Sequence, residues 1–468
     1  MKGLLNTFRE LRRYPSALLG LLVILVLVGI AIFTVITIPY SEAIRLWQGG
    51  AGVWEEYPRL APPAWFNLFY SKKVPETLFL RSAEGEATRE VEVRSPETSI
   101  ITLTYSFNYH YDEFPQELIV FFKPRYPTTT ANPSLSFAAI NWRTPDGREV
   151  SLGTLNLSPE VAVRFAQDAT LVRKLKKFIP EGVVFTDKEL QVGVAPEKVL
   201  FLDPNQATPT PLKGDYTLTI KVTTFEPGAD VEANFVSYGK LYGLAGTDHY
   251  RRDLTLPLLW GTPVALSFGL LAAFGTTVAT MVLAAISTWY GGVVDQIIQR
   301  VTQVNMVLPL LPILIMVGTF YSRSIWLMLG LVILLSIFGS GIMNFRAIFM
   351  QVKESAYIEA ARSYGASNMR VVFRYLVPRI IPMLIPGLVT GIPAYVFLEA
   401  GLAFLGLGDP SLPTWGKVIN DAQQMGALYN GQYYWVLEPA ILLMITGLGF
   451  AMLGFALDRI FNPRLRGM

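Results

Sequence analysis

The sequence contains no cysteine and only two histidines, His110 and His249, among its 468 residues. The absence of cysteine excludes disulfide bonds, cysteine zinc sites and thiol chemistry, and two histidines are too few for a His-rich metal site. A phosphate-binding loop of the G-x-x-x-x-G-K-[ST] type is also missing, because neither Gly239-Lys240 nor Gly416-Lys417 fits that frame. We therefore expect no metal site, no cofactor on this chain and no ATP hydrolysis by such a loop.

Charged side chains are scarce, at 16% of the residues against about 25% in ordinary soluble proteins. The shortage is uneven, because 50 charged residues fall between Glu42 and Asp253 and only 25 in the rest of the chain. The net charge of +3, without a basic stripe that has interleaved aromatics, argues against nucleic acid as a partner. The sequence therefore predicts a membrane protein that carries one large soluble domain.

Several apolar runs are long enough to cross a bilayer as helices. The first, 14–41, is predicted to be a permanent anchor, because a signal peptide has an apolar core of about 7–15 residues and an A-x-A-like site after it. The second, 254–294, is too long for one straight helix, so we expect a helix near 264–288 with an interfacial stretch before it. With 301–322, 324–345, 380–408 and 439–457, the sequence predicts an α-helical polytopic membrane protein with six transmembrane helices.

Positive charges are distributed unevenly over the loops between these runs. Most of the lysines and arginines outside the soluble region fall on one side, whereas the short loops on the other side contain only Arg323 and Lys417. Because cytoplasmic loops carry the excess of positive charge, both termini are predicted to be cytoplasmic. We therefore divide the chain into 1–41, an extracytoplasmic insert at 42–253 between the first two helices, and a five-helix core at 254–468.

The insert has the patterns of a mainly β domain. Alternating apolar residues at 101–111 and 216–222 predict two strands with one buried face each. Pro145-Asp146-Gly147 predicts a hairpin turn. One helix is expected from Pro159 to Phe178, with Ser158 as its N-cap. No catalytic set of residues stands out in this domain, which favours binding or packing over chemistry.

The segment between the fourth and fifth predicted spans has the most informative pattern. Residues 357–367 predict a short alanine-rich helix followed by a glycine that permits a turn. A second amphipathic stretch is expected to stop at Pro378 and Pro382. Ala360 and Ala361 keep one helix face small, so that another protein surface can approach the backbone. From these features alone, the segment could also be an ordinary basic connecting loop.

This pattern resembles the EAA motif of ABC importer permeases, which consists of a glutamate–alanine–alanine helix, a glycine and a closing leucine/valine–proline. In that family, the segment is the coupling helix, which rests in a groove of the ATPase subunit and transmits its motion. The resemblance assigns ATPase coupling to the cytoplasmic loop 346–379 and to its matching residues Glu359, Ala360, Ala361, Arg362, Gly365, Ala366 and Pro378.

Other stretches are similar to the C-type permeases of the dipeptide, oligopeptide and nickel group of these importers. The matching stretches are 246–254, 289–295, 402–408, 413–416 and 462–465, so the resemblance covers 246–468 closely and 1–40 loosely. It assigns the extracytoplasmic mouth of the transport path to Gly246, Thr247, Asp248 and Asp253.

The chain departs from the pattern of that group in two places. Arg251 stands where the group usually has a glycine, and Pro257 and Pro263 stand where it usually has arginines. The insert replaces what is commonly a short connection, so the resemblance implies nothing about the fold of 42–245.

The resemblance implies a permease subunit of a binding-protein-dependent importer in a prokaryotic cell membrane. The implied partners are a second homologous permease, two subunits that bind ATP and Mg, an extracytoplasmic substrate-binding protein and the lipid bilayer. Peptide is the implied cargo, with an oligosaccharide or a metal chelate as alternatives. Glu399 in the fifth span either lines the translocation path or bonds to a neighbouring helix.

Two hypotheses of other classes remain to be weighed. A membrane sensor or anchor that binds a ligand through its outer domain explains the insert, but it explains neither the six spans nor the lack of a signalling module after 457. A membrane enzyme would need a nucleophile or an acid–base set, and the sequence offers no convincing one. For the insert, its position between the first two spans favours a docking or shielding platform for the binding protein.

Overall fold

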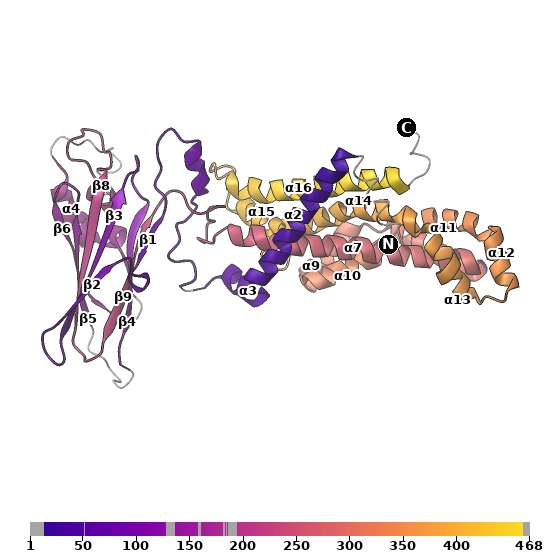
Figure 1. Ribbon diagram of the computed structural model, residues 1–468, viewed down its shortest axis with the longest axis horizontal. Helices are drawn as coiled ribbons and strands as arrows, with labels where there is room; N and C mark the ends of the chain where they lie inside the picture. The colour runs from indigo at the N-terminus through magenta and orange to yellow at the C-terminus, as the bar shows by residue number, and fades with distance from the viewer. Residues whose placement is uncertain are drawn as a thin grey trace. The chain divides into compact units, whose positions relative to one another are not determined.

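The structure is a computed structural model that describes residues 14–50, 52–127, 136–157, 161–180, 183, 185 and 194–461. The chain divides into two compact units, one made of Met1–Gly49 with Leu254–Met468 and the other of Gly50–Asp253. The first unit is helical, and the second is built on two β-sheets (Figure 1).

The helical unit combines long apolar helices with several short ones. Its described helices are α2 (Pro15–Thr37), α3 (Tyr40–Gln48), α7 (Thr255–Tyr290), α8 (Gly292–Val307), α9 (Leu310–Phe320), α10 (Ile325–Ile337), α11 (Ser340–Lys353), α12 (Ala356–Ser363), α13 (Asn368–Val371), α14 (Val377–Phe404), α15 (Trp415–Gln424) and α16 (Tyr434–Phe461).

Four helical stretches among the described residues are long and apolar enough to span a membrane: α2, α7, the run Asn368–Phe404 and α16. Two further candidates are bent pairs, because α8 and α9 meet at 76° and α10 and α11 at 47°. The described residues thus provide four to six candidate spans. The predicted polytopic helical fold with a sheet-rich domain is confirmed at this level.

The second predicted span differs from its expected form. Instead of an interfacial stretch followed by a helix near 264–288, α7 is one helix from Thr255 to Tyr290. Pro257 lies in its first turn, where no backbone N–H has an intrahelical partner, so the proline costs no hydrogen bond there. Pro263 removes only one such bond from the helix interior, and the rest of the helix continues through it.

Two glycines bring α2 and α16 into close contact. A Cβ atom at Gly20 would lie 2.9 Å from the backbone nitrogen of Leu453, and a Cβ atom at Gly449 would lie 2.7 Å from Val23 Cγ1. Because apolar helices in lipid associate through close packing, these glycines fix the point at which α2 crosses α16.

The sheet unit consists of antiparallel strands in two sheets. The four-stranded sheet has the order β1-β9-β4-β7, and the five-stranded sheet has the order β2-β3-β8-β5-β6. The strands are β1 (Leu78–Arg81), β2 (Thr88–Val93), β3 (Ser99–Tyr109), β4 (Glu117–Arg125), β5 (Ser136–Arg143), β6 (Glu149–Leu157), β7 (Val161–Arg164), β8 (Gly214–Thr224) and β9 (Asp230–Tyr238).

Alternating side chains from both sheets form the core of this unit. The buried members of β3 and β8 face each other in register, for example Phe107 opposite Tyr216, whose rings stack at 5.8 Å. The Tyr105 hydroxyl donates to the Ala233 carbonyl oxygen at 2.6 Å and so links the two sheets. The two predicted alternating strands are confirmed, and the turn at 145–147 joins β5 to β6 as expected.

The helix predicted from Pro159 to Phe178 is wrong in its first half. Val161–Arg164 forms strand β7 against β4, and helix α4 (Ala169–Leu175) begins only after Asp168. The Asp168 carboxylate accepts hydrogen bonds from the backbone nitrogens of Thr170 and Leu171, at 2.8 and 3.1 Å. This capping fixes the start of the helix. Ser158 and Pro159 lie outside the described residues.

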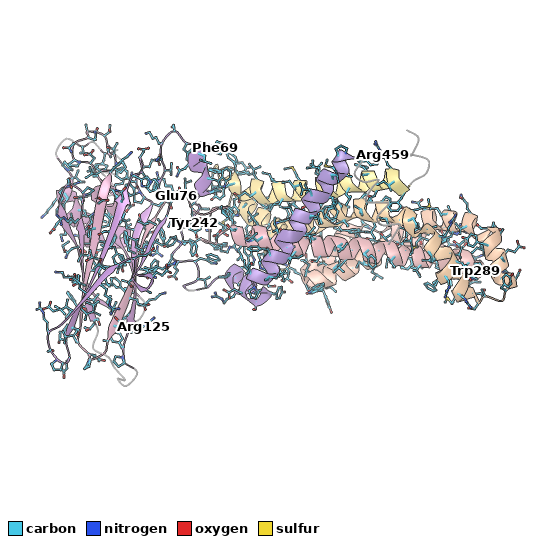
Figure 2. The ribbon with its side chains drawn as sticks, in the orientation of Figure 1. Phe69, Glu76, Arg125, Tyr242, Trp289 and Arg459 are labelled. Atoms are coloured by element: carbon cyan, nitrogen blue, oxygen red, sulfur yellow. The ribbon has the colours of Figure 1, made fainter. Side chains whose placement is uncertain are left out.

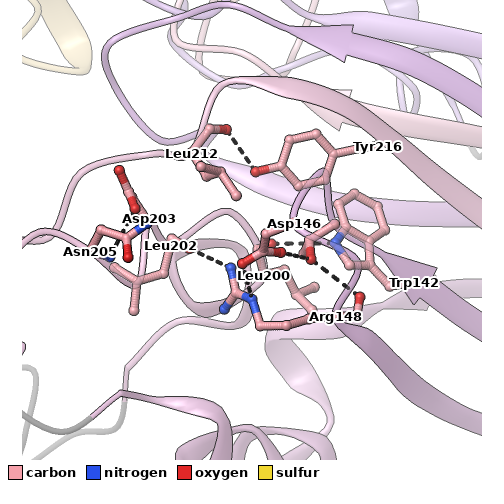
Figure 3. A network of polar contacts seen from close by, with 10 residues as sticks. Trp142, Asp146, Arg148, Leu200, Leu202, Asp203, Asn205, Leu212 and Tyr216 are labelled. Atoms are coloured by element: carbon pink, nitrogen blue, oxygen red, sulfur yellow. Dashed lines mark hydrogen bonds and ion pairs between the residues drawn. The ribbon is translucent and has the colours of Figure 1, made fainter.

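A polar network holds the segment between helix α6 (Pro196–Leu200) and β8 against the β5–β6 hairpin (Figure 3). The Arg148 guanidinium pairs with Asp146 at 2.7 Å and donates to the Leu202 carbonyl oxygen at 2.8 Å. The Tyr216 hydroxyl donates to the Leu212 carbonyl oxygen at 2.7 Å. These bonds satisfy buried backbone acceptors that a loop over a sandwich edge would otherwise leave unpaired.

Glu197 in α6 is a buried carboxyl group of the sheet unit, and its Oε2 atom has no hydrogen-bond partner among the described residues. Burial raises the pKa of this carboxyl to about 7, and the negative charge of Glu117 acts in the same direction. Because the folded state holds the proton more tightly than the unfolded chain does, the resulting stability is present below pH 4.5 and is lost as the pH rises through 7.

Candidate coupling surface

The segment with the EAA pattern folds as a short helix, α12, that a glycine ends. Ser355 precedes it with extended backbone angles, and alanine, a good helix former, occupies three of its positions. Gly365 has a φ of +76°, the left-handed region that favours glycine. The Ala366 and Gly365 nitrogens donate to the carbonyl oxygens of Ala361 and Arg362, at 3.0 and 2.9 Å. This pair of bonds is the Schellman motif, so the predicted turn is confirmed.

Helix α12 has one buried face and one exposed face. Ile358 belongs to the apolar cluster that Phe349 of α11 and Val371 of α13 also join. Ala361 is buried as well, so of the two alanines predicted to keep one face small for another protein, only Ala360 is exposed. Tyr357, Glu359, Ala360 and Arg362 are exposed, and Tyr364 just after the helix is 92% exposed. The helix thus presents a small side chain and a carboxylate away from its packing contacts, with the exposed Arg362 at the edge of the packed face. Such a face can receive another protein without moving the cluster.

Trp289, in the last turn of α7, joins α12 to two longer helices (Figure 2). The guanidinium carbon of Arg362, on α12, lies 5.8 Å from the centroid of the Trp289 ring. The ammonium group of Lys353, at the end of α11, lies 5.6 Å from the same centroid. Lys353 also donates to the carbonyl oxygens of Thr288 and Trp289, at 2.9 and 3.2 Å. These carbonyls belong to the last turn of α7, where a cation is stabilised by the helix dipole.

A second contact ties α8 to α11 close to the same point. The Arg346 guanidinium bonds both carboxylate oxygens of Asp295, at 2.8 and 2.6 Å. The Ser287 hydroxyl, from α7, donates to the same carboxylate at 2.5 Å. A bidentate pair of this kind restricts orientation as well as distance. Helices α7, α8 and α11 therefore form one braced support for α12.

The stretch after α12 was predicted to stop at Pro378 and Pro382. This prediction is wrong, because the helix continues past both prolines. Residues Val372–Leu376 form a π-helical turn, η5, and α14 then runs through both Pro378 and Pro382. The wider turn before Pro378 removes the clash that a proline ring makes with the preceding turn of an α-helix. Since α11 ends at Lys353 and α14 begins at Val377, only the middle of the predicted loop 346–379 lies between the long helices.

Glu399 is buried in α14, with 6% of its surface exposed, and it forms a side-chain hydrogen bond with Thr414. Thr414 is also the N-cap of α15, because its hydroxyl accepts from the Lys417 backbone nitrogen at 3.3 Å. The carboxyl group therefore contacts the segment before α15. Of the two roles predicted for Glu399, this contact matches bonding to a neighbouring segment.

Trp415 and Gly416, the first two residues of α15, account for its close packing on α7 and α14. Trp415 Nε1 donates to the Leu258 carbonyl oxygen of α7 at 3.0 Å, and its ring lies against Gly261. A Cβ atom at Gly416 would lie 2.7 Å from the Ala400 Cα atom of α14. Glycine at these two points lets α15 pack directly on the backbones of α7 and α14.

The residues assigned to the outer mouth fold inward within the sheet unit. Thr247 and Asp248 are fully buried, and the backbone of Thr247 bonds to that of Ala61 at 2.8 Å. The Asp248 carboxylate accepts from Arg252 Nε at 2.6 Å and from the backbone nitrogens of Tyr250 and Arg252. Gly246 has a φ of +72°, and Thr247 forms a β-bridge with Asp253. These residues fix the course of the chain just before α7.

Arg251 has a backbone conformation that suits glycine, the residue expected at this position from the resemblance. Its φ is +67°, which is costly for any residue with a Cβ atom. The side chain compensates by donating to the Tyr57 carbonyl oxygen at 2.7 Å and by lying 4.8 Å from the centroid of the Tyr238 ring. It also pairs with Glu117 at 3.7 Å. The arginine thus anchors the turn to the strands β4 and β9 of the sheet unit.

Some residues that build this site were not assigned a role from the sequence. Lys353 and Arg346 counted there only as positive charges on one side of the membrane, and Trp289 only as part of a matching stretch. The sequence offered no signal that pairs Trp289 with Lys353 and Arg362, because the loop 346–379 contains six lysines and arginines. Among the described residues, no group of three or more His, Cys, Asp or Glu side chains could hold a metal ion.

Comparisons with known proteins agree with this arrangement. Residues 255–467 match the family of binding-protein-dependent transport system inner membrane components. A dipeptide transport system permease protein of Alkalihalophilus pseudofirmus is 27% identical over 224 residues, which are 47% of this chain and 72% of that protein. A protein of Brucella suis with the name of a peptide transport system permease is 30% identical over 250 residues, 52% of this chain and 81% of that protein.

One further relative and one solved structure complete the comparison. An oligopeptide transport system permease protein of Lactococcus lactis is 28% identical over 223 residues, 47% of this chain and 75% of that protein. Among solved structures, the inward-facing MetNI methionine ABC transporter is similar with a TM-score of 0.34 and 18% identity, over 44% of this chain and 96% of that one.

These sequence matches cover most of each relative's length and, on this chain, include the helical segment that carries α12. The matched proteins are translocating subunits and not ATPases. The chain therefore belongs to the inner membrane components of binding-protein-dependent transport systems, as a permease subunit of the ABC importer group that contains the dipeptide and oligopeptide permeases of the C type.

Proposed function

We propose that this permease subunit imports peptides and that α12 receives the movement of an ATP-binding subunit. The observation that carries the proposal is the exposed face of α12, with Glu359, Ala360 and Arg362, above a support braced by Trp289 and Asp295. An ATPase that pushes or turns α12 would act on α7, α8 and α11 together, because all three contact the same cluster. Access to the path would then alternate with ATP hydrolysis.

The partners follow from the family. We infer a second homologous permease, two subunits that bind ATP and Mg, and an extracytoplasmic binding protein that delivers the cargo. Counting each bent pair as one span gives six spans in a prokaryotic cell membrane, with both termini in the cytoplasm. Six is an even number and places both termini on one side, which agrees with the distribution of positive charge.

The coupling role is tested by adding bulk to the exposed face of α12. Ala360→Trp replaces a small exposed side chain where a partner surface would lie, and we expect loss of substrate-stimulated ATP hydrolysis and of uptake by tenfold or more. The double change Glu359→Lys with Gly365→Trp removes the carboxylate and strains the turn at φ +76°. Gln423→Trp, at an exposed position of α15, is the matched control and should leave both activities unchanged. Normal uptake in the two α12 variants would refute the coupling role.

Peptide cargo is supported by the names of the relatives, which are dipeptide, oligopeptide and peptide permeases. The assembly can be purified with its binding protein, and bound small molecules can be identified by mass spectrometry. Release of short peptides is the expected result. An oligosaccharide or a metal chelate in their place would move the assignment to the alternative cargo of this group.

We also propose that the sheet unit is a docking or shielding platform for the binding protein. The structure offers a clean place to remove it, because the Tyr242 nitrogen bonds to the Pro62 carbonyl oxygen at 2.8 Å. Replacing residues 63–241 by a short glycine linker keeps the bonds of Thr247 to Ala61 and of Arg251 to Tyr57, and removes the contacts of Arg251 with Glu117 and Tyr238. We expect weaker capture of the binding protein and slower uptake. Unchanged affinity and uptake would show that the platform role is wrong.

A conservative substitution can distinguish the two roles predicted for Glu399. In the proposed structural role, Glu399→Gln still bonds to Thr414, so uptake and cargo preference should both persist. A carboxylate that contacts the cargo would instead give a selective loss of uptake for cationic peptides. That result would place Glu399 in the translocation path.

A further inference from the structure

An exposed apolar patch lies on the stem of the sheet unit, which we define as the segments 52–77 and 239–253. Its members are large side chains from both segments: Trp65, Leu68, Phe69, Tyr70 and Leu244. Leu68 is 82% exposed, Phe69 (Figure 2) 76% and Leu244 75%. Trp65 Nε1 donates to the Leu244 carbonyl oxygen at 2.9 Å, which joins the two segments into one surface.

The backbone under this patch is held in place by hydrogen bonds. Residues Ala64–Leu68 form a short 3₁₀ helix, η1, and the Ala64 nitrogen donates to the Gly243 carbonyl oxygen at 2.9 Å. The Asn67 side chain bonds both the nitrogen and the carbonyl oxygen of Val74 at 3.0 Å. The exposed side chains therefore extend from a fixed scaffold. Their exposure is a property of the fold and not of a loose loop.

The composition of the patch is that of a membrane–water interface. Tryptophan, tyrosine, phenylalanine and leucine lie together, and Lys72 and Lys73 follow directly. Aromatic rings and lysines of this kind are enriched at the level of lipid headgroups, where rings meet the acyl boundary and ammonium groups meet phosphates. Strand β2, by contrast, is exposed along its length with the sequence T-R-E-V-E-V. Most of the exposed aromatic side chains and leucines described in the sheet unit thus lie on the stem.

The chain keeps the stem within reach of the bilayer. Leu244 precedes Thr255, the first residue of the apolar helix α7, by 11 positions. A fully extended chain covers at most about 3.5 Å per residue, so the tether is at most about 40 Å long. We propose that this patch inserts into the headgroup region of the membrane that holds α7. The proposal rests on the chain's place in a membrane and is independent of the role of α12.

The absence of cysteine makes the patch directly accessible to site-specific labels. Leu68→Cys would carry a nitroxide spin label in the full-length chain, purified with its partner subunits in nanodiscs of phosphatidylethanolamine and phosphatidylglycerol. Collision rates with oxygen, which dissolves in lipid, would be compared with those of a water-soluble nickel chelate. We expect oxygen to exceed nickel at 68. The matched control is Val93→Cys on β2, a 70% exposed apolar position where nickel should exceed oxygen.

Two results would overturn the proposal. Nickel exceeding oxygen at 68, as at the control, would show a patch in water. Low collision rates with both reagents would show that a protein surface covers it. If Leu68→Cys lowers the yield of folded chain, Leu244→Cys provides the same measurement from the other segment, with the same expected result.

Discussion

Trp289→Leu tests how α12 is connected to the rest of the helical unit. The change keeps an apolar side chain in the cluster but removes the ring that faces Arg362 and Lys353, at 5.8 and 5.6 Å. A cation–π contact contributes about 0.5–1 kcal/mol at partly exposed sites, so the two together contribute about 1–2 kcal/mol. Because about 1.4 kcal/mol is a factor of ten, the attached arrangement of α12 should become roughly 5- to 30-fold less populated relative to a detached one.

The expected phenotype is uncoupling. ATP-binding subunits should still associate with α12, because the change lies on α7 and keeps Glu359 and Ala360 in place, and they should still hydrolyse ATP. Cargo moved per ATP hydrolysed should fall by roughly 5- to 30-fold in proteoliposomes that contain the whole importer. Trp289→Phe keeps a ring for the two cations and should retain most of the coupling. Trp326→Leu, at a tryptophan that is 67% exposed on α10, is the matched control.

A double-mutant cycle separates this effect from simple damage to the fold. Arg362→Gln removes one of the two cations, so its effect should be smaller when Trp289 is already leucine. Unchanged transport per ATP in Trp289→Leu, with normal assembly and normal ATP hydrolysis, would refute the idea that α12 acts through α7. Equal and additive losses in the two single variants would show that the ring and the guanidinium do not interact.

Other predictions concern stability and packing. The sheet unit should lose about 2 kcal/mol of stability between pH 5 and pH 7, and Glu197→Gln should remove this pH dependence. Pulse proteolysis of the full-length chain measures it, and an unchanged pH dependence in the variant would contradict the assignment. Gly416→Ala should destabilise the helical unit by about 1–3 kcal/mol in thermal unfolding, whereas Gly330→Ala, with nothing within 4 Å, should be neutral or stabilising. Arg251→Ala keeps the strained φ of +67° and loses the anchoring contacts, so it should be less stable than Arg251→Gly by about 1 kcal/mol; the reverse order would exclude strain at this position.

Local features of the fold could be predicted from the sequence wherever the cause lies within a few residues. Gly365 is an example, because a left-handed φ after a short helix favours glycine whatever packs nearby. The strand at 99–109 is another, since its alternation encodes one buried face. The start of α4 was missed because Asp168 competes with Ser158 as a cap, and only the pairing of β7 with β4 decides between them.

Features that depend on distant segments could not be predicted in this way. Trp289 meets Lys353 and Arg362 across more than 60 residues of sequence, and only the packing of α7, α11 and α12 brings them together. The burial of Asp248 and Thr247 likewise depends on the stem segment around Ala61. The assignment of these residues to an outer mouth stays a prediction from the resemblance, and the direction in which their side chains point could not be predicted at all.

The contact between α12 and an ATP-binding subunit is the central claim, and photo-cross-linking tests it most directly. A photoreactive amino acid at position 360 or 364 of the full-length chain, irradiated in cell membranes, should form an adduct with the ATP-binding subunit. The same amino acid at position 423 on α15 should form none. An adduct at 360 and 364 but not at 423 is the result that the structure predicts, and the lack of any adduct from α12 in an assembled, active importer would contradict it.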